Sequence, residues 1–463
     1  MYSRRDQVQA HSFLVGRLTS AVLRVDPDAL DRPLRRTVVG LAGGTAVAGL
    51  VLVVVLVVGL LSPKSGGAWR EPGTLVVDED TGSRYLFVEG KLRPVLNYAS
   101  ARLLVGGGPK VAAVGTADLK GVPQGGPIGI MGAPDSLPTG GGARAWTVCS
   151  MSTPDGPGVA LALTADVPGS PAPAAPAPQP AAGSAAQPAS PAAEGALLVR
   201  APDGSTHLAW HDRRMRVTAT WVPAALGLDP ATVVPVTASW LNTLPAGPDL
   251  GSPDVRRGGA GPVIGGAPTV VGQLLEVPES VVGRKFYLVE AGGLVPLTDT
   301  VAALLVADPA TPEPPRRVTA SALANVPLHP VPDWQSATPA ALPTPLELDG
   351  GAPCVRWTGE SAEVIAGPQI TAGRGPATQA VVRDARTADR VEVAPGAGLL
   401  VRTRPAPGVP GAGLYLVTDA GTKFPVASGD AAAALGTPAD TATPVPADLI
   451  ALLPTGPVLD RIT

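Results

Sequence analysis

The sequence predicts an α+β protein: one N-terminal transmembrane helix, then an extracytoplasmic region of four small hairpin-plus-helix repeats around a β-rich central domain. Three observations predict this class. A long uncharged run lies near the N-terminus, a strand–turn–strand pattern recurs after it, and Gly (56) with Pro (54) makes almost a quarter of the 463 residues. Proline at this density limits long helices and central strands, so short strands and turns are expected.

The uncharged run predicts a transmembrane helix over residues 37–61. From Val38 to Leu61 the sequence contains no charged side chain. At about 1.5 Å per residue, this helix reaches roughly 36 Å and crosses a hydrocarbon core of about 30 Å with some tilt. A cleaved signal peptide would have a shorter apolar region, nearer the start and followed by an A-x-A site, which is missing here. We therefore expect an uncleaved anchor.

The arginines before this span predict a cytoplasmic N-terminus. In the first ten residues beyond the span, only Lys64 and Arg70 are basic. The positive-inside rule places the more basic flank in the cytoplasm, so about 400 residues would lie outside. The net charge of -3 gives no basic field that would attract nucleic acid. The arginines on the basic flank are Arg4, Arg5, Arg17, Arg24, Arg32, Arg35 and Arg36.

Residues 1–36 form the predicted cytoplasmic segment, and most of it is one helix that stops before Pro27. The apolar residues between Val8 and Val25 roughly fit one helical face, with two arginines off that face. Two interpretations remain open: a helix that lies on the anionic membrane surface, and a helix that docks a partner inside the cell. The candidate docking residues are Arg4, Arg5, Phe13, Arg17 and Leu18.

Self-comparison of the downstream region finds repeats. YLFVEGKLRPVLN begins at Tyr85, YLVEAGGLVPLTD at Tyr287 and YLVTDAGTKFPVAS at Tyr415, and a weaker copy begins at His207. Each copy predicts a strand, a turn with Gly, a second strand and an Ala/Leu-rich helix. One such unit is too small to bury a core alone, so each should pack on a neighbour or on a central module. The predicted repeats are 69–122, 197–250, 270–326 and 399–446.

Two long segments between the repeats predict one central domain, with the repeats at its periphery in two pairs. Residues 123–196 form its first part and residues 327–398 its second, and residues 447–463 follow as a C-terminal tail. Within the first part, residues 167–195 are Pro/Ala/Ser-rich. Such a composition cannot bury enough apolar surface to offset the entropy of ordering, so a disordered loop is expected there.

Each long segment holds one of the two cysteines, Cys149 and Cys354. Because both would lie in an oxidising compartment, we expect a disulfide between them that ties the two parts of the central domain together. Trp146 and Trp357 each lie three residues from a cysteine. Tryptophan packing against a buried disulfide is common in β-rich domains, so both side chains are expected against the bond.

Residues that could carry catalysis are few. No G-x-x-x-x-G-K-[ST] loop occurs, and the fragments nearest to it, at Glu89 and Ala420, lack the spacing that wraps a phosphate. His207 and His211 fall in a predicted strand and turn, so no metal site is expected. Asp135, in Gly-Ala-Pro-Asp, is typical of a turn. The sequence therefore predicts no catalytic, metal-binding or cofactor-binding residue, and no cofactor.

Four blocks of the sequence resemble the EccB family, the membrane core component of the type VII (ESX) secretion systems of actinobacteria. The first, SRRDQVQAHSFLVGRLTSAVLRVDPD, precedes a Pro-Leu-Arg-Arg edge and one span. LNYASARLLVG begins at Leu96, and GPIGIMGAPDSLP begins at Gly126 with Met131 where the family usually has Pro. The tail LIALLPTGPVLD begins at Leu449. The resemblance thus extends over essentially the whole chain.

The resemblance implies a non-enzymatic structural subunit in the cytoplasmic membrane, with four repeat domains around a β-rich central domain. It implies as partners the motor ATPase EccC, the channel protein EccD, EccE, the mycosin protease and further copies of the chain. Some family members carry an ATPase label, which nothing in this sequence supports locally. Two alternatives remain: a membrane-bound ATP hydrolase, disfavoured by the external location, and a cell-wall-binding module, disfavoured by an aromatic content of 3%.

Overall fold

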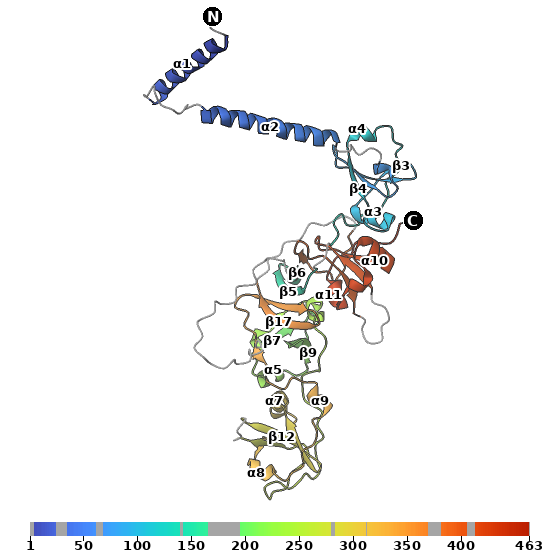
Figure 1. The fold of residues 1–463 in the computed structure, drawn as a ribbon. Coiled ribbons are helices and arrows are strands. Elements are labelled where there is room, and N and C mark those ends of the chain that lie inside the picture. The colour runs from blue at the N-terminus through green and yellow to red at the C-terminus, as the bar shows by residue number, and fades with distance from the viewer. Residues whose placement is uncertain are drawn as a thin grey trace. The chain divides into compact units, whose positions relative to one another are not determined.

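The computed structural model describes residues 4–24, 35–61, 68–138, 142–164, 195–278, 283–311, 313–368, 381–404 and 413–462. The chain divides into two compact units, Met1–Glu71 and Pro72–Thr463. The first unit is helical and the second is rich in short strands (Figure 1), so the predicted α+β class is confirmed. The predicted loop 167–195 lies outside the described residues, except that Gly195 already begins a strand.

The first unit contains two long helices, α1 (Arg4–Arg24) and α2 (Arg35–Leu61), and the 3₁₀ turn η1 (Ala68–Arg70). Within α2, the segment Val39–Val57 is long and apolar enough to cross a membrane, and none of it is buried inside the protein. A helix in water would not leave apolar side chains exposed on every face, because their burial is the main driving force of folding. Lipid is therefore the environment that α2 fits.

The described residues of the second unit form four copies of a β-β-β-α-β-α repeat. In repeat 1 the first strand pairs antiparallel with the second, and the second pairs antiparallel with the third. The fourth strand lies on the other side of the first and runs parallel to it, so the spatial order is third, second, first, fourth. A helix joins the third strand to the fourth, and a shorter helix follows. The elements are β1 (Leu75–Asp78), β2 (Arg84–Val88), β3 (Lys91–Pro94), α3 (Tyr98–Val105), β4 (Val111–Val114) and α4 (Thr116–Leu119).

The other three repeats have the same strand order. Repeat 2 contains β7 (Gly195–Arg200), β8 (Thr206–Trp210), β9 (Arg213–Val217), α5 (Val222–Ala225), η2 (Pro230–Thr232), β10 (Val234–Pro235) and α6 (Ala238–Asn242). Repeat 3 contains β11 (Leu274–Val277), β12 (Lys285–Glu290), β13 (Gly293–Leu297), α7 (Asp299–Ala307), β14 (Arg316–Arg317) and α8 (Ala320–Leu323). Repeat 4 contains β19 (Leu399–Thr403), β20 (Leu414–Val417), β21 (Lys423–Val426), α10 (Gly429–Leu435), η3 (Ala439–Thr441), β22 (Thr443–Val445) and α11 (Ala447–Ala451).

The repeat is larger than the predicted hairpin and helix. The sequence pattern marks only the second and third strands, where Tyr85 faces Pro94, and the same Tyr–Pro pairing occurs in repeats 3 and 4. The first strand, the parallel fourth strand and the second helix complete the unit. The fourth strand is only two residues long in repeats 2 and 3, which is too short to show an alternating pattern.

A further short strand, here called the closing strand, ends each repeat. It follows the second helix and runs parallel to the third strand through two backbone hydrogen bonds; in repeat 1, Leu92 N donates to Pro123 O and Gly125 N donates to Leu92 O. The same two bonds join Arg214 to 245–247, Leu294 to 327–329 and Lys423 to 454–456. The sequence there is Pro-x-Gly in repeats 1, 2 and 4.

Repeat 3 departs from Pro-x-Gly because His329 replaces the glycine. In repeat 2 the glycine is needed, since a Cβ on Gly247 would lie 2.9 Å from Met215 Cγ. In repeat 3 the space comes from the opposite strand, where a Cβ on Gly293 would lie 2.5 Å from His329 Nε2. His329 Nδ1 lies 2.9 Å from Glu290 Oε2. A glycine on one strand or the other thus permits the close approach.

The central domain is a five-stranded sheet in the order β17-β16-β5-β6-β18. It combines strands from both long segments: β5 (Ala145–Thr153) and β6 (Gly156–Thr164) from the first, and β16 (Ala352–Thr358), β17 (Ser361–Gly367) and β18 (Arg390–Val393) from the second. Before β16, the chain forms α9 (Asp333–Ser336) and the short strand β15 (Thr344–Pro345), which pairs with β7. Antiparallel pairing of β5 with β16 joins the two parts.

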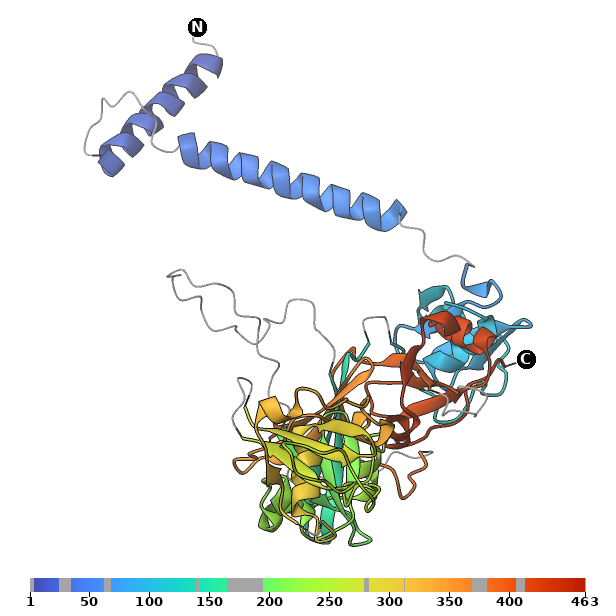
Figure 2. The same cartoon turned by 90° about the horizontal axis from the view of Figure 1, so that it is seen from below.

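Packing places repeats 2 and 4 next to the central sheet. Their second helices, α6 and α11, bury Trp240, Leu241, Leu449 and Ile450 in one core with the sheet residues Trp146, Val148 and Val355. In contrast, α4 and α8 of repeats 1 and 3 contain no fully buried residue. Repeat 1 packs on repeat 4 through α3 and α10, and repeat 3 packs on repeat 2 through α7 and α5 (Figures 1 and 2). Repeats 1 and 3 are therefore the outer members of the two pairs.

The two helices in this contact, α3 and α10, begin and end in the same way. Asn97 caps the start of α3 by accepting from Ser100 N, and Ser428 does the same for Ala431 N in α10. Each helix ends at a left-handed glycine, Gly106 or Gly436. Arg102 Nε donates to Ala434 O at 2.8 Å, so a cation from repeat 1 lies at the C-terminal, partially negative end of α10.

Through the closing strands, three stretches outside the predicted repeat bounds pair with a repeat. Residues 123–138 were assigned to the central domain but pair with repeat 1, through Gln124 and Ile128. Pro327 to His329, also assigned to the central domain, pair with repeat 3. The tail 447–463 was assigned to no repeat, yet α11 and the strand after it complete repeat 4.

Candidate functional site: the central disulfide and the assembly surfaces

The two cysteines are bonded in the centre of the five-stranded sheet. Cys149 on β5 faces Cys354 on β16, with a Cα–Cα distance of 4.0 Å and an S–S bond of 2.05 Å across 205 residues of sequence. Both side chains are buried with Ala352, and the partly buried Ile365 packs against them. Gly367, opposite Ala352 on β17, leaves the space that the sulfur of Cys354 fills. The bond thus ties the first central segment to the second.

The expected packing of Trp146 and Trp357 against the disulfide is wrong. These residues face each other on β5 and β16, three positions from the cysteine pair. Successive side chains on a strand point to opposite faces, so an offset of three places the tryptophans on the other side of the sheet. They lie in the main core with Val148 and Val355.

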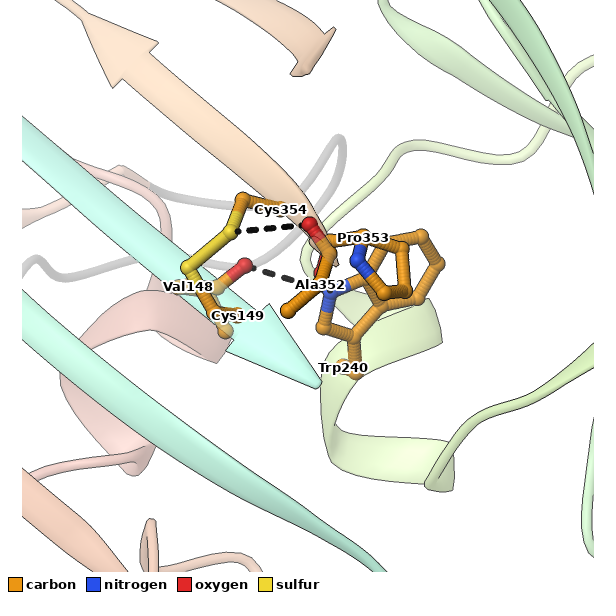
Figure 3. The surroundings of a disulfide bond; sticks show 6 residues. All are labelled: Val148, Cys149, Trp240, Ala352, Pro353 and Cys354. Carbon is orange, nitrogen blue, oxygen red and sulfur yellow. Dashed lines mark hydrogen bonds between the residues drawn. A yellow bond between two sulfur atoms is a disulfide. The ribbon is translucent and has the colours of Figure 1, made fainter. Parts of the chain in front are cut away.

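Trp240, on α6 of repeat 2, is the tryptophan that supports this site, although no sequence pattern predicts it. Its ring is fully buried, and Nε1 donates to Val148 O at 3.1 Å and to Pro353 O at 3.2 Å (Figure 3). These carbonyls belong to the residues just before the two cysteines. A repeat is therefore bonded to both central strands at the point where the disulfide crosses them. Nothing in the sequence near Trp240 signals this, because the contact is long-range.

The five candidate docking residues lie on α1 but do not share a face. Phe13 and Leu18 are five residues apart, which is about 140° around a helix of 3.6 residues per turn. The predicted common face is therefore corrected. Val8, Val15 and Val22 follow one another at seven-residue spacing, and Leu18 lies three residues after Val15 and four before Val22, so these four share a face. Phe13 lies outside this face. All of these side chains are exposed within the first unit. Arg17 falls opposite Val8, whereas Arg4 falls on the apolar side.

The remaining polar candidates have structural partners. Asp135 accepts from Arg84 Nη1 at 2.6 Å and from Tyr98 N at 2.9 Å, and so holds the start of α3. His207 lies on β8, beside Ser205, and burial lowers its pKa. Among the residues that the structure describes, no group of three or more His, Cys, Asp or Glu side chains could hold a metal ion.

Lys423 is an unusual buried cation in repeat 4. Its side chain is 9% exposed and its ammonium group donates to Ile450 O at 2.8 Å, at the end of α11. Burial lowers its pKa from 10.5 to about 8, although the carboxylate of Asp384 acts in the opposite direction. The folded state therefore binds this proton less tightly than the unfolded chain does, which makes stability depend on pH.

We expect the free energy of unfolding to rise from pH 8 to pH 10.5 because of Lys423. In this window the unfolded lysine holds its proton and the folded one releases it, so the cost of burying the charge disappears. The rise is at most about 3 kcal/mol, from roughly 1.4 kcal/mol per pKa unit. Comparison with Lys423→Met, by denaturant unfolding at each pH, isolates this contribution. Parallel pH profiles for the two proteins would contradict it.

Comparison with known proteins gives one consistent result. Residues 1–463 match the family model described as type VII secretion system ESX-1, transport TM domain B. The chain is similar to "ESX-3 secretion system ATPase EccB3" of Mycolicibacterium smegmatis, with 29% identity over 99% of this chain and 89% of that protein. It is also similar to "ESX-5 secretion system ATPase EccB5" of Mycobacterium tuberculosis, with 30% identity over 99% of this chain and 92% of that protein.

Solved structures of such proteins have the same fold. A chain of an intact ESX-5 inner membrane complex matches with a TM-score of 0.63 and 27% identity, over 100% of this chain and 94% of that one. The EccB3 dimer from the ESX-3 core complex matches with a TM-score of 0.64 and 26% identity, over 84% of this chain and 98% of that one. The similarity therefore extends through the repeats and the central sheet.

Proposed function

Since this chain belongs to the EccB family of type VII (ESX) secretion systems, we propose that it is a structural subunit of an ESX membrane complex and forms part of its extracytoplasmic assembly. The observation that carries the proposal is the architecture of the two units. An exposed apolar helix suited to lipid precedes a compact unit of repeats that a buried disulfide and shared cores hold together. Such a body serves as a scaffold in protein export.

The subunit acts without hydrolysing ATP, although relatives are named ATPases. The sequence contains no G-x-x-x-x-G-K-[ST] loop, whose backbone would wrap a nucleotide phosphate. The second unit also lies on the side of the membrane where ATP is not supplied. Its partners would be those of a secretion machine: the motor ATPase EccC, EccD, EccE, the mycosin protease and further copies of itself. Relatives are present in an inner membrane complex and as a dimer, which supports the assembly role.

The four repeats and the central domain form separate parts of this scaffold. We place repeat 1 at residues 69–138, repeat 2 at 195–250, repeat 3 at 252–331 and repeat 4 at 399–462. The central domain then retains 142–164 and 340–398. Limited proteolysis of the purified chain should cut between these parts before it cuts within them.

The N-terminus lies in the cytoplasm and the second unit outside it. Seven arginines precede or begin α2, against Lys64 and Arg70 just after it. A reporter that is active only outside the cytoplasm should therefore be active when fused after Gly66 and inactive when fused at Ser3. The reverse pattern would place the repeats inside the cell and refute the external scaffold.

The apolar side of α1 docks a cytoplasmic partner. We expect Leu18→Asp to weaken copurification with the other subunits by roughly 30-fold, because burial of a leucine contributes about 2 kcal/mol. Phe13→Asp is the matched control, with the same chemistry on another side of the helix. Both variants should remain in the membrane. If Leu18→Asp and Phe13→Asp copurify equally well with the other subunits, a helix that lies on the lipid surface is favoured instead.

A further inference from the structure

Each closing strand has an outer edge that can accept another strand. Its flanking residues make the bonds to the third strand, so the middle residue directs both its N–H and its C=O the other way. Four positions are equivalent in this respect: Gln124, Ala246, Leu328 and Thr455. Any extended segment that lies alongside one of them can form the paired bonds of a β-bridge.

In repeat 4 this edge is occupied by the chain itself. Val382 N donates to Thr455 O at 2.8 Å, and Thr455 N donates to Val382 O at 2.9 Å. Val382 comes from the part of the central domain between β17 and β18, and it pairs antiparallel with the closing strand. The protein therefore contains one filled example of the site.

In repeat 2 the equivalent edge opens into a cleft. Among the residues that the structure describes, none forms a hydrogen bond to the backbone of Ala246 on this side. The cleft has a volume of about 690 Å³, within the range of sites that bind ligands. One wall is the closing strand with the β8–β9 turn, and the other is the turn after α9, from Ser336 to Pro339.

The wall opposite Ala246 satisfies its own hydrogen-bond donors. Ser336 Oγ donates to Pro332 O, Ala337 N donates to Asp333 O, and Thr338 N donates to Gln335 O. That wall therefore offers side-chain contact but leaves the backbone groups of Ala246 for a bound segment. Arg213, half exposed at the rim, pairs with Asp212, so the entrance has no strong net charge.

We propose that an extended segment of a partner protein binds in this cleft as an additional strand beside Ala246, as Val382 does beside Thr455. The proposal rests on the chain being a subunit of a larger complex. The residue that pairs with Ala246 must carry an N–H, which excludes proline, and β-branched neighbours such as Val381 and Val382 suit an extended backbone. Backbone pairing supplies the affinity, and the cleft walls select the side chains.

The chain's own Pro/Ala segment does not fit this site. Residues 168–194 contain no Val, Ile or Thr, and 8 of these 27 residues are proline. Each proline lacks an N–H to donate, and without β-branched or aromatic residues the segment has a low preference for the conformation of an added strand. A second copy of the chain fits poorly as well, because the extended segment that fills such an edge in this chain, at Val382, is already bonded to Thr455 of its own repeat 4. A different polypeptide is therefore the occupant we assign.

The test uses the full-length chain with a photo-crosslinking residue at Ala337, an exposed position on the far wall. After crosslinking in native membranes, peptide mass mapping should identify one proline-free segment of a different protein. Ala246→Pro, which removes the outward N–H, should reduce the adduct at least tenfold. Gln124→Pro is the matched control, since it makes the same change at the equivalent position of repeat 1. An adduct to this chain, no adduct, or equal adducts in both variants would overturn the proposal.

Amide exchange gives a second measurement that needs no variant. The Ala246 amide should exchange at least tenfold more slowly in the purified complex than in the full-length chain alone, whereas the Thr455 amide is protected in both. Equal exchange at Ala246 in the two samples would refute the cleft as a strand site while leaving the subunit role intact. Failure to isolate any complex would instead contradict the proposed function.

Discussion

Replacing both cysteines, in Cys149→Ala/Cys354→Ala, should lower the stability of the second unit by about 2–5 kcal/mol. The bond closes a loop of 205 residues, for which the chain-entropy model gives roughly 5 kcal/mol as an upper value. Alanine avoids placing a hydroxyl among the apolar neighbours Ala352 and Ile365. Thermal unfolding of the purified full-length chain, followed by near-UV circular dichroism, would measure the loss.

The single variant Cys149→Ala is the control for this measurement. If the crosslink itself stabilises the protein, the single and double variants should lose nearly the same stability. Mass mapping of unreduced wild-type peptides should show the pair 149–354 linked. Unchanged stability of the double variant, with the linked pair present in the wild type, would contradict the structural role of the bond.

Trp240→Ala should destabilise the protein by about 3–5 kcal/mol, among the largest effects expected for one side chain. The indole is completely buried between repeat 2 and the central sheet, so truncation leaves a cavity at their junction. It also removes the donor that both Val148 O and Pro353 O share. Denaturant unfolding of the full-length chain measures the change.

Two variants separate the contributions of Trp240. Trp240→Phe keeps most of the ring but loses the N–H, so a loss of about 1–2 kcal/mol is expected. Trp221→Ala removes a half-buried indole of the same repeat, and a smaller loss than for Trp240→Ala is expected. If Trp240→Ala and Trp221→Ala were equally mild, repeat 2 would not be bonded to the central sheet through this residue.

The features that could be predicted from the sequence are those with a local signal. The uncharged run predicts α2 because lipid imposes a length and a composition on one continuous segment. The Tyr-to-Pro pattern predicts the central hairpin of repeats 1, 3 and 4, because two adjacent strands and their turn are contiguous in sequence. The pair Cys149–Cys354 could be predicted only because the chain contains no third cysteine.

The features that could not be predicted depend on long-range contacts. The parallel fourth strands β10 and β14 have two residues each, and their pairing partners lie about 30 to 40 residues earlier in the sequence. Pro-x-Gly does leave a signal, since it recurs in the closing strands of repeats 1, 2 and 4, but its role becomes clear only when the third strand that it pairs with is known. The side of the sheet on which Trp146 lies could have been predicted from its odd offset to Cys149.

The most direct test of the scaffold role is purification of the complex from native membranes by a tag on this chain, followed by mass spectrometry. We expect the other membrane subunits of one ESX system to copurify with it in fixed ratios. ATP hydrolysis by the sample should survive when this chain alone is exchanged for its Trp240→Phe variant and should be lost when the motor ATPase is removed. If this chain is recovered without other subunits and the purified chain itself hydrolyses ATP, the account is contradicted.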